Sequence, residues 1–136
     1  MKKTLMILFV AVASLTACKK DSEDKLKGRW DLVKEYYVET LNGTKTGEDT
    51  DTYNEGDLYV VFSGNNYKVY DHGDLEDEGT FTANDNSITL KDSDGDEETL
   101  QLRWNSKNEF VMISEDSYSN DGQTYHYKNE TTFRKN

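Results

Sequence analysis

The stretch TLQLRW at residues 99–104 indicates which kind of secondary structure this chain forms. Two leucines and a tryptophan alternate with a threonine, a glutamine and an arginine. A period of two places the apolar side chains on one face of a β-strand and the polar ones on the other. Antiparallel sheets with one face buried have this alternation. We therefore expect a strand that packs one face into a hydrophobic core.

Seven further segments also have the composition of strands, and most are separated by short turns rich in Gly, Asn and Asp. They are residues 30–39, 58–62, 67–71, 79–83, 87–91, 109–113 and 124–134. Strands in simple succession predict an antiparallel meander, which closes into a barrel when the first strand pairs with the last. The one long connection, residues 40–56, is acidic and is expected to be an extended loop. The predicted fold class is all-β, an eight-stranded antiparallel up-and-down barrel after an N-terminal signal peptide.

The composition of the chain limits the functions that are compatible with it. Its 136 residues contain 27 acidic and 16 basic side chains, which give a formal net charge of −11 at pH 7. A length near that of one typical domain, with 12% aromatic residues to fill a core, predicts one globular domain. The negative charge argues against nucleic-acid binding, because phosphate backbones require clustered Lys and Arg. It also argues against electrostatic attachment to anionic lipid.

The first 18 residues have the organisation of an export signal. Two lysines follow the initiating methionine, and residues 4–15 (TLMILFVAVASL) are uncharged and mostly apolar. A membrane-spanning helix needs about 20 such residues, so this run fits the core of a signal peptide instead. The sequence Leu15-Thr16-Ala17-Cys18 then resembles the lipobox of bacterial lipoproteins. The resemblance implies cleavage between Ala17 and Cys18 and attachment of a diacylglycerol to the Cys18 sulfur.

Cys18 is the only cysteine, so it has no partner for an intramolecular disulfide. An ordinary signal peptide with a bystander cysteine is the alternative. On the lipoprotein interpretation, residues 1–17 are the signal peptide, residues 18–25 are the lipidated cysteine with a hydrated acidic tether, and residues 26–136 form the barrel domain. Lys19 resembles the sorting pattern of outer-membrane lipoproteins. The acidic cluster behind it resembles the surface-export signals of some Gram-negative lipoproteins, with solubility alone as the alternative. The expected location is the bacterial cell envelope, lipid-anchored at the outer membrane and, on the second resemblance, exposed at the surface.

A second resemblance lies at the start of the first predicted strand. Gly28-Arg29-Trp30 matches the G-x-W signature of lipocalins. That family consists of eight-stranded barrels that often hold a small apolar ligand, and its tryptophan closes one barrel end under an arginine from the last strand. The resemblance assigns this arginine to Arg134, with Arg103 as the weaker choice. The chain departs from the family in being shorter and in showing no helix pattern after the barrel.

The aromatic residues allow two interpretations of the barrel interior. Either they line a cavity for a small apolar or aromatic ligand, or they meet in the middle and fill it. Short strands with many bulky rings favour a mostly filled interior, which leaves room for a shallow pocket at one mouth. The candidate lining residues are Tyr36, Phe62, Tyr67, Phe81, Trp104, Tyr125 and Tyr127.

No pattern in the sequence predicts catalysis, a metal or a cofactor. The acidic run at residues 92–98 fails as an EF-hand, because Glu97 and Arg103 stand where Gly and Glu are required. A hydrated hairpin turn is favoured there, and weak surface calcium binding stays open. The only histidines, His72 and His126, lie in different segments and are expected in a turn and on a charged strand face.

The sequence therefore predicts a membrane-anchored, non-enzymatic binding module for a small apolar ligand. The alternative is a filled barrel that serves as a protein- or glycan-interaction domain of the cell envelope. No feature of the sequence identifies a protein partner.

Overall fold

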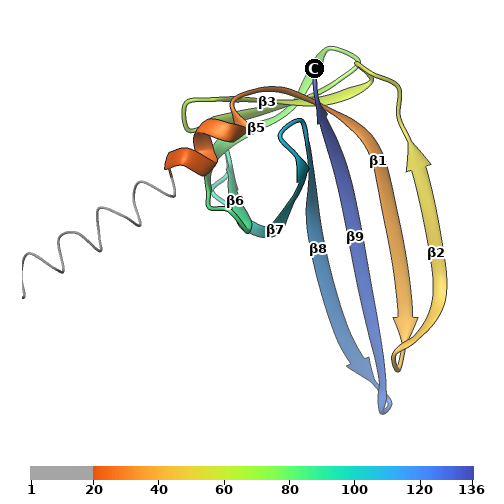
Figure 1. The fold of residues 1–136 in the computed structure, drawn as a ribbon. Helices are drawn as coiled ribbons and strands as arrows, with labels where there is room; N and C mark the ends of the chain where they lie inside the picture. Colours follow the sequence, from red (N-terminus) through yellow and green to blue (C-terminus); the bar gives the residue numbers. More distant parts are fainter. Residues whose placement is uncertain (1–19) are drawn as a thin grey trace, which may run out of the picture.

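The computed structural model describes residues 20–136, so the predictions on the signal peptide, on Ala17 and on Cys18 lie outside the described residues. A short helix at residues 20–26 precedes nine strands (Figure 1). The strands are β1 (Gly28–Leu41), β2 (Thr44–Thr52), β3 (Leu58–Ser63), β4 (Asn66–Asp71), β5 (Asp74–Ala83), β6 (Ser87–Asp92), β7 (Glu97–Ser106), β8 (Glu109–Asn120) and β9 (Gln123–Lys135).

All strand pairs are antiparallel, and their order is β2-β1-β3-β4-β5-β6-β7-β8-β9 with an additional pairing of β1 with β9. The β1–β9 pairing closes all strands except β2 into an eight-stranded barrel, which confirms the predicted fold class and the predicted closure of the first strand on the last. Closure leaves the barrel part of these strands without free edges.

The prediction of an extended loop at residues 40–56 was wrong, because residues 44–52 form strand β2. It pairs with the second half of β1, with Thr50 opposite Tyr36, while Gly28–Asp31 of the same strand pair with β3. The sequence of β2, TKTGEDTDT, contains no apolar residue because the strand buries neither face, and most of its residues are exposed. Without a buried face there is no alternation from which a strand could be predicted.

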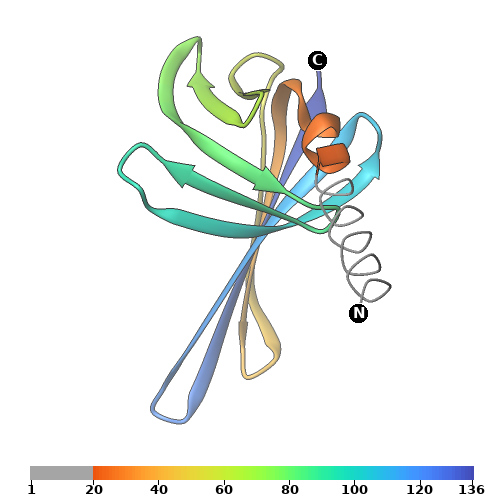
Figure 2. The same ribbon diagram turned by 90° about the vertical axis from the view of Figure 1, so that its left-hand side faces the viewer.

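A four-stranded extension projects from the barrel, and we call it the arm (Figure 2). It consists of residues 34–41 of β1, 44–52 of β2, 114–120 of β8 and 123–131 of β9. Because β8 and β9 pair without a register shift, the side of the arm that continues the barrel interior can be followed residue by residue, and we call it the inner face. Within residues 20–136, no strand pairs with the outer edge of β2 or with the free edge of residues 114–120 of β8.

The core fills one end of the barrel with aromatic rings. Trp30, Phe62, Phe81 and Phe110 are almost completely buried. The Trp30 and Phe110 ring centroids lie 4.7 Å apart and those of Phe62 and Phe81 lie 4.8 Å apart, both with edge-to-face geometry. Such pairs add about 0.5–1.5 kcal/mol to the stabilisation that comes from burying their area.

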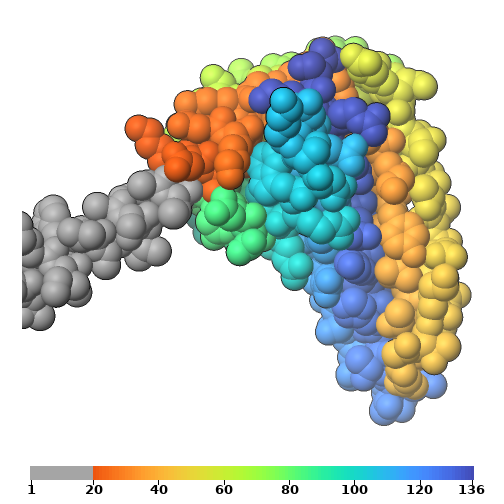
Figure 3. Space-filling model, in the orientation of Figure 1, coloured from red at the N-terminus to blue at the C-terminus, as the bar shows by residue number. Residues whose placement is uncertain are grey.

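The helix covers this filled end, although residues 20–25 were expected to belong to a hydrated tether (Figure 3). Leu26 is fully buried in the core cluster, and its carbonyl oxygen accepts a 2.6 Å hydrogen bond from the Trp30 indole. The Ser22 hydroxyl donates to the Asp85 carboxylate in the β5–β6 turn, 2.6 Å away. The buried Leu26 side chain and the Ser22–Asp85 hydrogen bond thus hold this polar segment against the barrel. Gly28, with φ of +108°, makes the turn from helix to strand.

Candidate functional site

An apolar cavity of about 270 Å³ lies inside the barrel. Three of its lining residues, Leu32, Met112 and Phe133, lie where β1, β8 and β9 continue into the arm. The cavity thus lies towards the end of the barrel opposite the helix. The remaining lining residues are Leu58, Tyr59, Val60, Phe62, Tyr67, Val69 and Leu90. The interior is therefore packed beneath the helix and hollow towards the arm.

The lining of the cavity carries no charged side chain. Its strands present Leu, Val and Phe inwards at alternate positions, while charged residues such as Lys68 point outwards from the same strands. The Tyr67 hydroxyl is held by a 3.1 Å hydrogen bond that it donates to Asp77. Burial of the ring raises the pKa of Tyr67 to about 12, and the bond to Asp77 adds to the shift.

The structure brings four of the seven predicted lining residues into the barrel. Phe62 and Tyr67 line the cavity itself. Phe81 is buried in the core. Trp104 packs against the core at the helix end, where the Trp104 ring contacts those of Trp30 and Phe110.

Tyr36 lies on the outer face, and its prediction as a lining residue was wrong. The register of β1 against β9 shifts between Leu32 and Lys34, which reverses the alternation for the rest of the strand. The Tyr36 hydroxyl instead donates to Glu48 on β2, 2.9 Å away. This bond and the nearby carboxylate raise the pKa of Tyr36.

Tyr125 and Tyr127 face inwards, but they lie on the arm beyond the barrel wall. There they stack with two tyrosines that the sequence did not single out. The Tyr118 ring is 4.9 Å from Tyr125, and the Tyr37 ring is 6.2 Å from Tyr127. No periodic signal pointed to Tyr118, because residues 114–120 are mostly polar on both faces and continue a strand that was expected to end at residue 113.

The tryptophan of the G-x-W motif closes the barrel end, but the cation beside it is Lys135 rather than Arg134. The Lys135 ammonium lies 5.0 Å from the Trp30 ring centroid and donates to the Lys27 carbonyl oxygen. Lys135 is the Cα partner of Trp30 in the β1–β9 ladder, so the neighbouring Arg134 points outwards, where it pairs with Glu109. Arg103 also lies outside, paired with Glu130.

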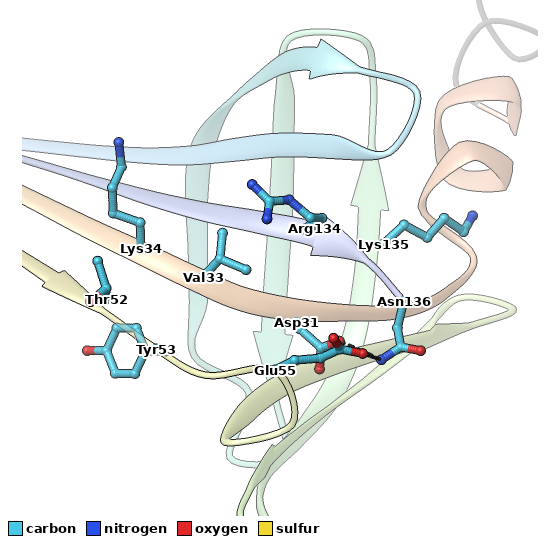
Figure 4. A pocket seen from close by; sticks show the side chains of 9 residues that line it. All are labelled: Asp31, Val33, Lys34, Thr52, Tyr53, Glu55, Arg134, Lys135 and Asn136. Atoms are coloured by element: carbon cyan, nitrogen blue, oxygen red, sulfur yellow. Dashed lines mark hydrogen bonds between the residues drawn. The ribbon is translucent and has the colours of Figure 1, made fainter.

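A larger hollow of about 580 Å³ lies on the outer surface where β1 leaves β3 for β2 (Figure 4). Asp31, Glu55 and Asn136 cluster at one end, and the Asn136 amide donates to both carboxylates. The buried Asp31 carboxylate also accepts two bonds from Arg29. These polar groups are satisfied by one another, and the lining of the hollow mixes apolar residues such as Val33 with charged ones such as Lys34 and Arg134. We therefore take the smaller, apolar cavity as the candidate binding site.

The remaining polar features of the sequence have structural roles. The Asp92 carboxylate accepts hydrogen bonds from the backbone amides of Asp94 and Asp96, which forms the β6–β7 hairpin turn. His72 lies in the β4–β5 turn with φ of +48°. His126 lies on the outer face of the arm, 3.2 Å from Glu115. Residues 20–136 contain no group of three or more His, Cys, Asp or Glu side chains placed to hold a metal ion.

Comparisons of the chain with protein-family models, with curated proteins and with solved structures found no match. In the described part of the chain, no helix has the length and apolar character needed to cross a membrane.

Proposed function

We propose that the protein is a lipid-anchored, non-enzymatic binding module that takes a small apolar molecule into the barrel cavity. The observation that carries this proposal is the uncharged lining of the cavity. Its volume of about 270 Å³ is close to the lower end of the range of about 300–1,000 Å³ typical of small-molecule sites. A single aliphatic chain or a small ring system is the class of ligand that fits such a site.

The position of the helix gives the anchored protein an orientation. The lipid attachment is proposed at Cys18, and residue 20, the first residue that the structure describes, already belongs to the helix. Two residues span at most about 7 Å, so the lipid would hold the helix-covered end of the barrel against the bilayer. The cavity and the arm lie towards the other end of the barrel and would then face away from the membrane. On this arrangement the ligand enters from the aqueous side rather than directly from the bilayer.

Native mass spectrometry of the full-length protein in a neutral detergent tests the binding proposal. We expect wild-type protein to carry a defined added mass, either co-purified or after incubation with 1-decanol as an aliphatic probe. Val69→Trp fills the cavity and should abolish this added mass. Lys68→Trp places the same ring on the outer face of the same strand and should retain it. Wild-type protein without bound ligand, or equal binding by both variants, would overturn the proposal.

A further inference from the structure

Four tyrosines form one continuous stack on the inner face of the arm, in the order Tyr37, Tyr127, Tyr118 and Tyr125. Successive ring centroids are 6.2, 5.9 and 4.9 Å apart, with interplanar angles of 23°, 16° and 10°. Tyr37 and Tyr118 are 37% and 50% exposed. They are two of the three large hydrophobic residues that residues 20–136 expose to this degree, and the stack joins them into one surface. An exposed aromatic surface of this kind marks an interaction site.

Charge is segregated between the two faces of the arm. The inner-face positions that follow from the strand registers include five carboxylates and no Lys, Arg or His: Glu35, Glu39, Asp49, Asp51 and Asp116. The cations of the arm, Lys34, Lys45, His126 and Lys128, all occupy outer-face positions. Several outer cations are paired with carboxylates, such as Lys45 with Glu48 and Lys128 with Glu130.

The carboxylates and the tyrosine stack form a single surface. Glu39 and Asp116 are the cross-strand partners of Tyr127 on its two sides, and Asp49 is the partner of Tyr37. The Tyr127 hydroxyl donates to the Tyr118 hydroxyl at 3.4 Å, so the phenol oxygens lie close together. The nearby carboxylates and phenols thus form an electron-rich strip without a compensating cation on the same face.

We propose that the inner face of the arm is a docking surface for an extended basic segment, rich in Arg and Lys, of a partner protein. Charge complementarity identifies this occupant, because guanidinium and ammonium groups bond to carboxylates and pack on aromatic rings. A neutral glycan fits this face less well, because it would leave the five inner-face carboxylates without a charged partner. Solubility alone would not account for the surface, because it would favour the carboxylates without the exposed rings.

Isothermal titration calorimetry tests this proposal with the full-length protein in a neutral detergent. The probe is a synthetic decapeptide of alternating Arg and Thr. The double variant Glu39→Gln/Asp116→Asn should weaken binding tenfold or more. The control Glu76→Gln/Asp94→Asn removes the same charge from exposed positions outside the arm and should change affinity less than twofold. Tyr37→Ala, which leaves the charge unchanged, should weaken binding at least threefold.

Three outcomes would overturn the docking surface. Equal weakening in the arm and control variants would mean that the peptide responds only to overall charge. If the peptide does not bind measurably to the wild-type protein, the inner face of the arm is not a docking surface for a basic segment. Tyrosine-dependent binding of neutral dextran, without peptide binding, would assign the face to a glycan. Thermal unfolding of each variant shows whether it is folded, and the cavity variant Val69→Trp should bind the peptide normally, which separates this proposal from the cavity.

Discussion

The indole Nε1 of Trp30 donates a 2.6 Å hydrogen bond to the carbonyl oxygen of Leu26, and both side chains are fully buried. This bond joins the end of the helix to the first barrel strand. It also satisfies a polar indole group that is buried among Phe110 and Trp104. The helix is therefore part of the barrel's core, and the proposed lipid anchor would act on a folded element.

Substitutions at this junction should destabilise the whole barrel. Trp30→Ala is expected to lower the free energy of unfolding by about 3–5 kcal/mol, and Leu26→Ala by about 2–5 kcal/mol, because each leaves a cavity in a packed core. Equilibrium urea unfolding measures both. A loss below about 1 kcal/mol for Leu26→Ala would mean that the helix does not contribute to the core.

The sequence predicted strands where one face of the strand is buried and the other is exposed to solvent. Residues 79–83 and 99–104 are such segments, and both lie on strands of the barrel. Strand β2 and residues 114–120 of β8 were missed because these two segments are largely exposed on both faces and carry mostly polar residues. Alternation reports burial, so a strand without a buried face gives no periodic signal.

The residues of the site were predictable only where the alternation of side chains between the two faces of a strand could be followed along the sequence. Phe62 and Tyr67 are cross-strand partners in the β3–β4 pair, which has no register shift, and both line the cavity. Tyr36 lies beyond the irregularity between Leu32 and Lys34, and one extra residue moves every later side chain to the other face. Nothing in the local sequence marks that position. The helix was missed because its single buried apolar residue, Leu26, gives no amphipathic pattern.

The cation beside Trp30 can be identified by comparing two neighbouring substitutions. Lys135→Met should lower the free energy of unfolding by about 0.5–1 kcal/mol, the size of an exposed cation–π contact. Arg134→Met removes only an exposed ion pair with Glu109 and should cost about 0–1 kcal/mol. Intrinsic Trp fluorescence distinguishes them, because only Lys135→Met should change the environment of the Trp30 ring. A spectral change seen only in Arg134→Met would mean that Arg134, as the sequence resemblance implied, is the cation beside Trp30.

The β4–β5 turn should respond to pH through His72. Its hydrogen bond to Asp71, with the nearby Asp57 and Asp74 carboxylates, raises the pKa of His72. A raised pKa in the folded protein means that the contribution to stability is complete below the unfolded-state pKa and is lost as pH rises through the folded-state pKa. NMR titration should show a lower His72 pKa in Asp71→Asn and no change in the distant Asp94→Asn. An unchanged pKa in Asp71→Asn would contradict the assigned cause.

Gly79 should be required for the close approach of β5 to β6. A Cβ atom at this position would lie 2.0 Å from the Lys91 carbonyl oxygen and 2.9 Å from the Tyr67 ring. Gly79→Ala should therefore cost about 1–3 kcal/mol through overpacking. Gly47→Ala is the matched control, since its Cβ would meet Glu39 only at an ordinary distance of 3.9 Å, and it should stay within about 0.5 kcal/mol of wild type. If Gly79→Ala and Gly47→Ala change the midpoint of thermal unfolding equally, β5 and β6 can move apart at Gly79 without a loss of stability.

Cys18→Ala tests the proposed anchor independently of the barrel. We expect the variant to lose incorporation of labelled fatty acid and to leave the membrane fraction, because no other element in residues 20–136 is long and apolar enough to be a spanning helix. Its midpoint of thermal unfolding should match that of the wild type in the same detergent, since the helix and barrel are formed by residues 20–136. Ser22→Ala provides the matched control, because it changes the helix contact to Asp85 and should leave fatty-acid labelling intact. Fatty-acid labelling that persists in Cys18→Ala would disprove the anchor.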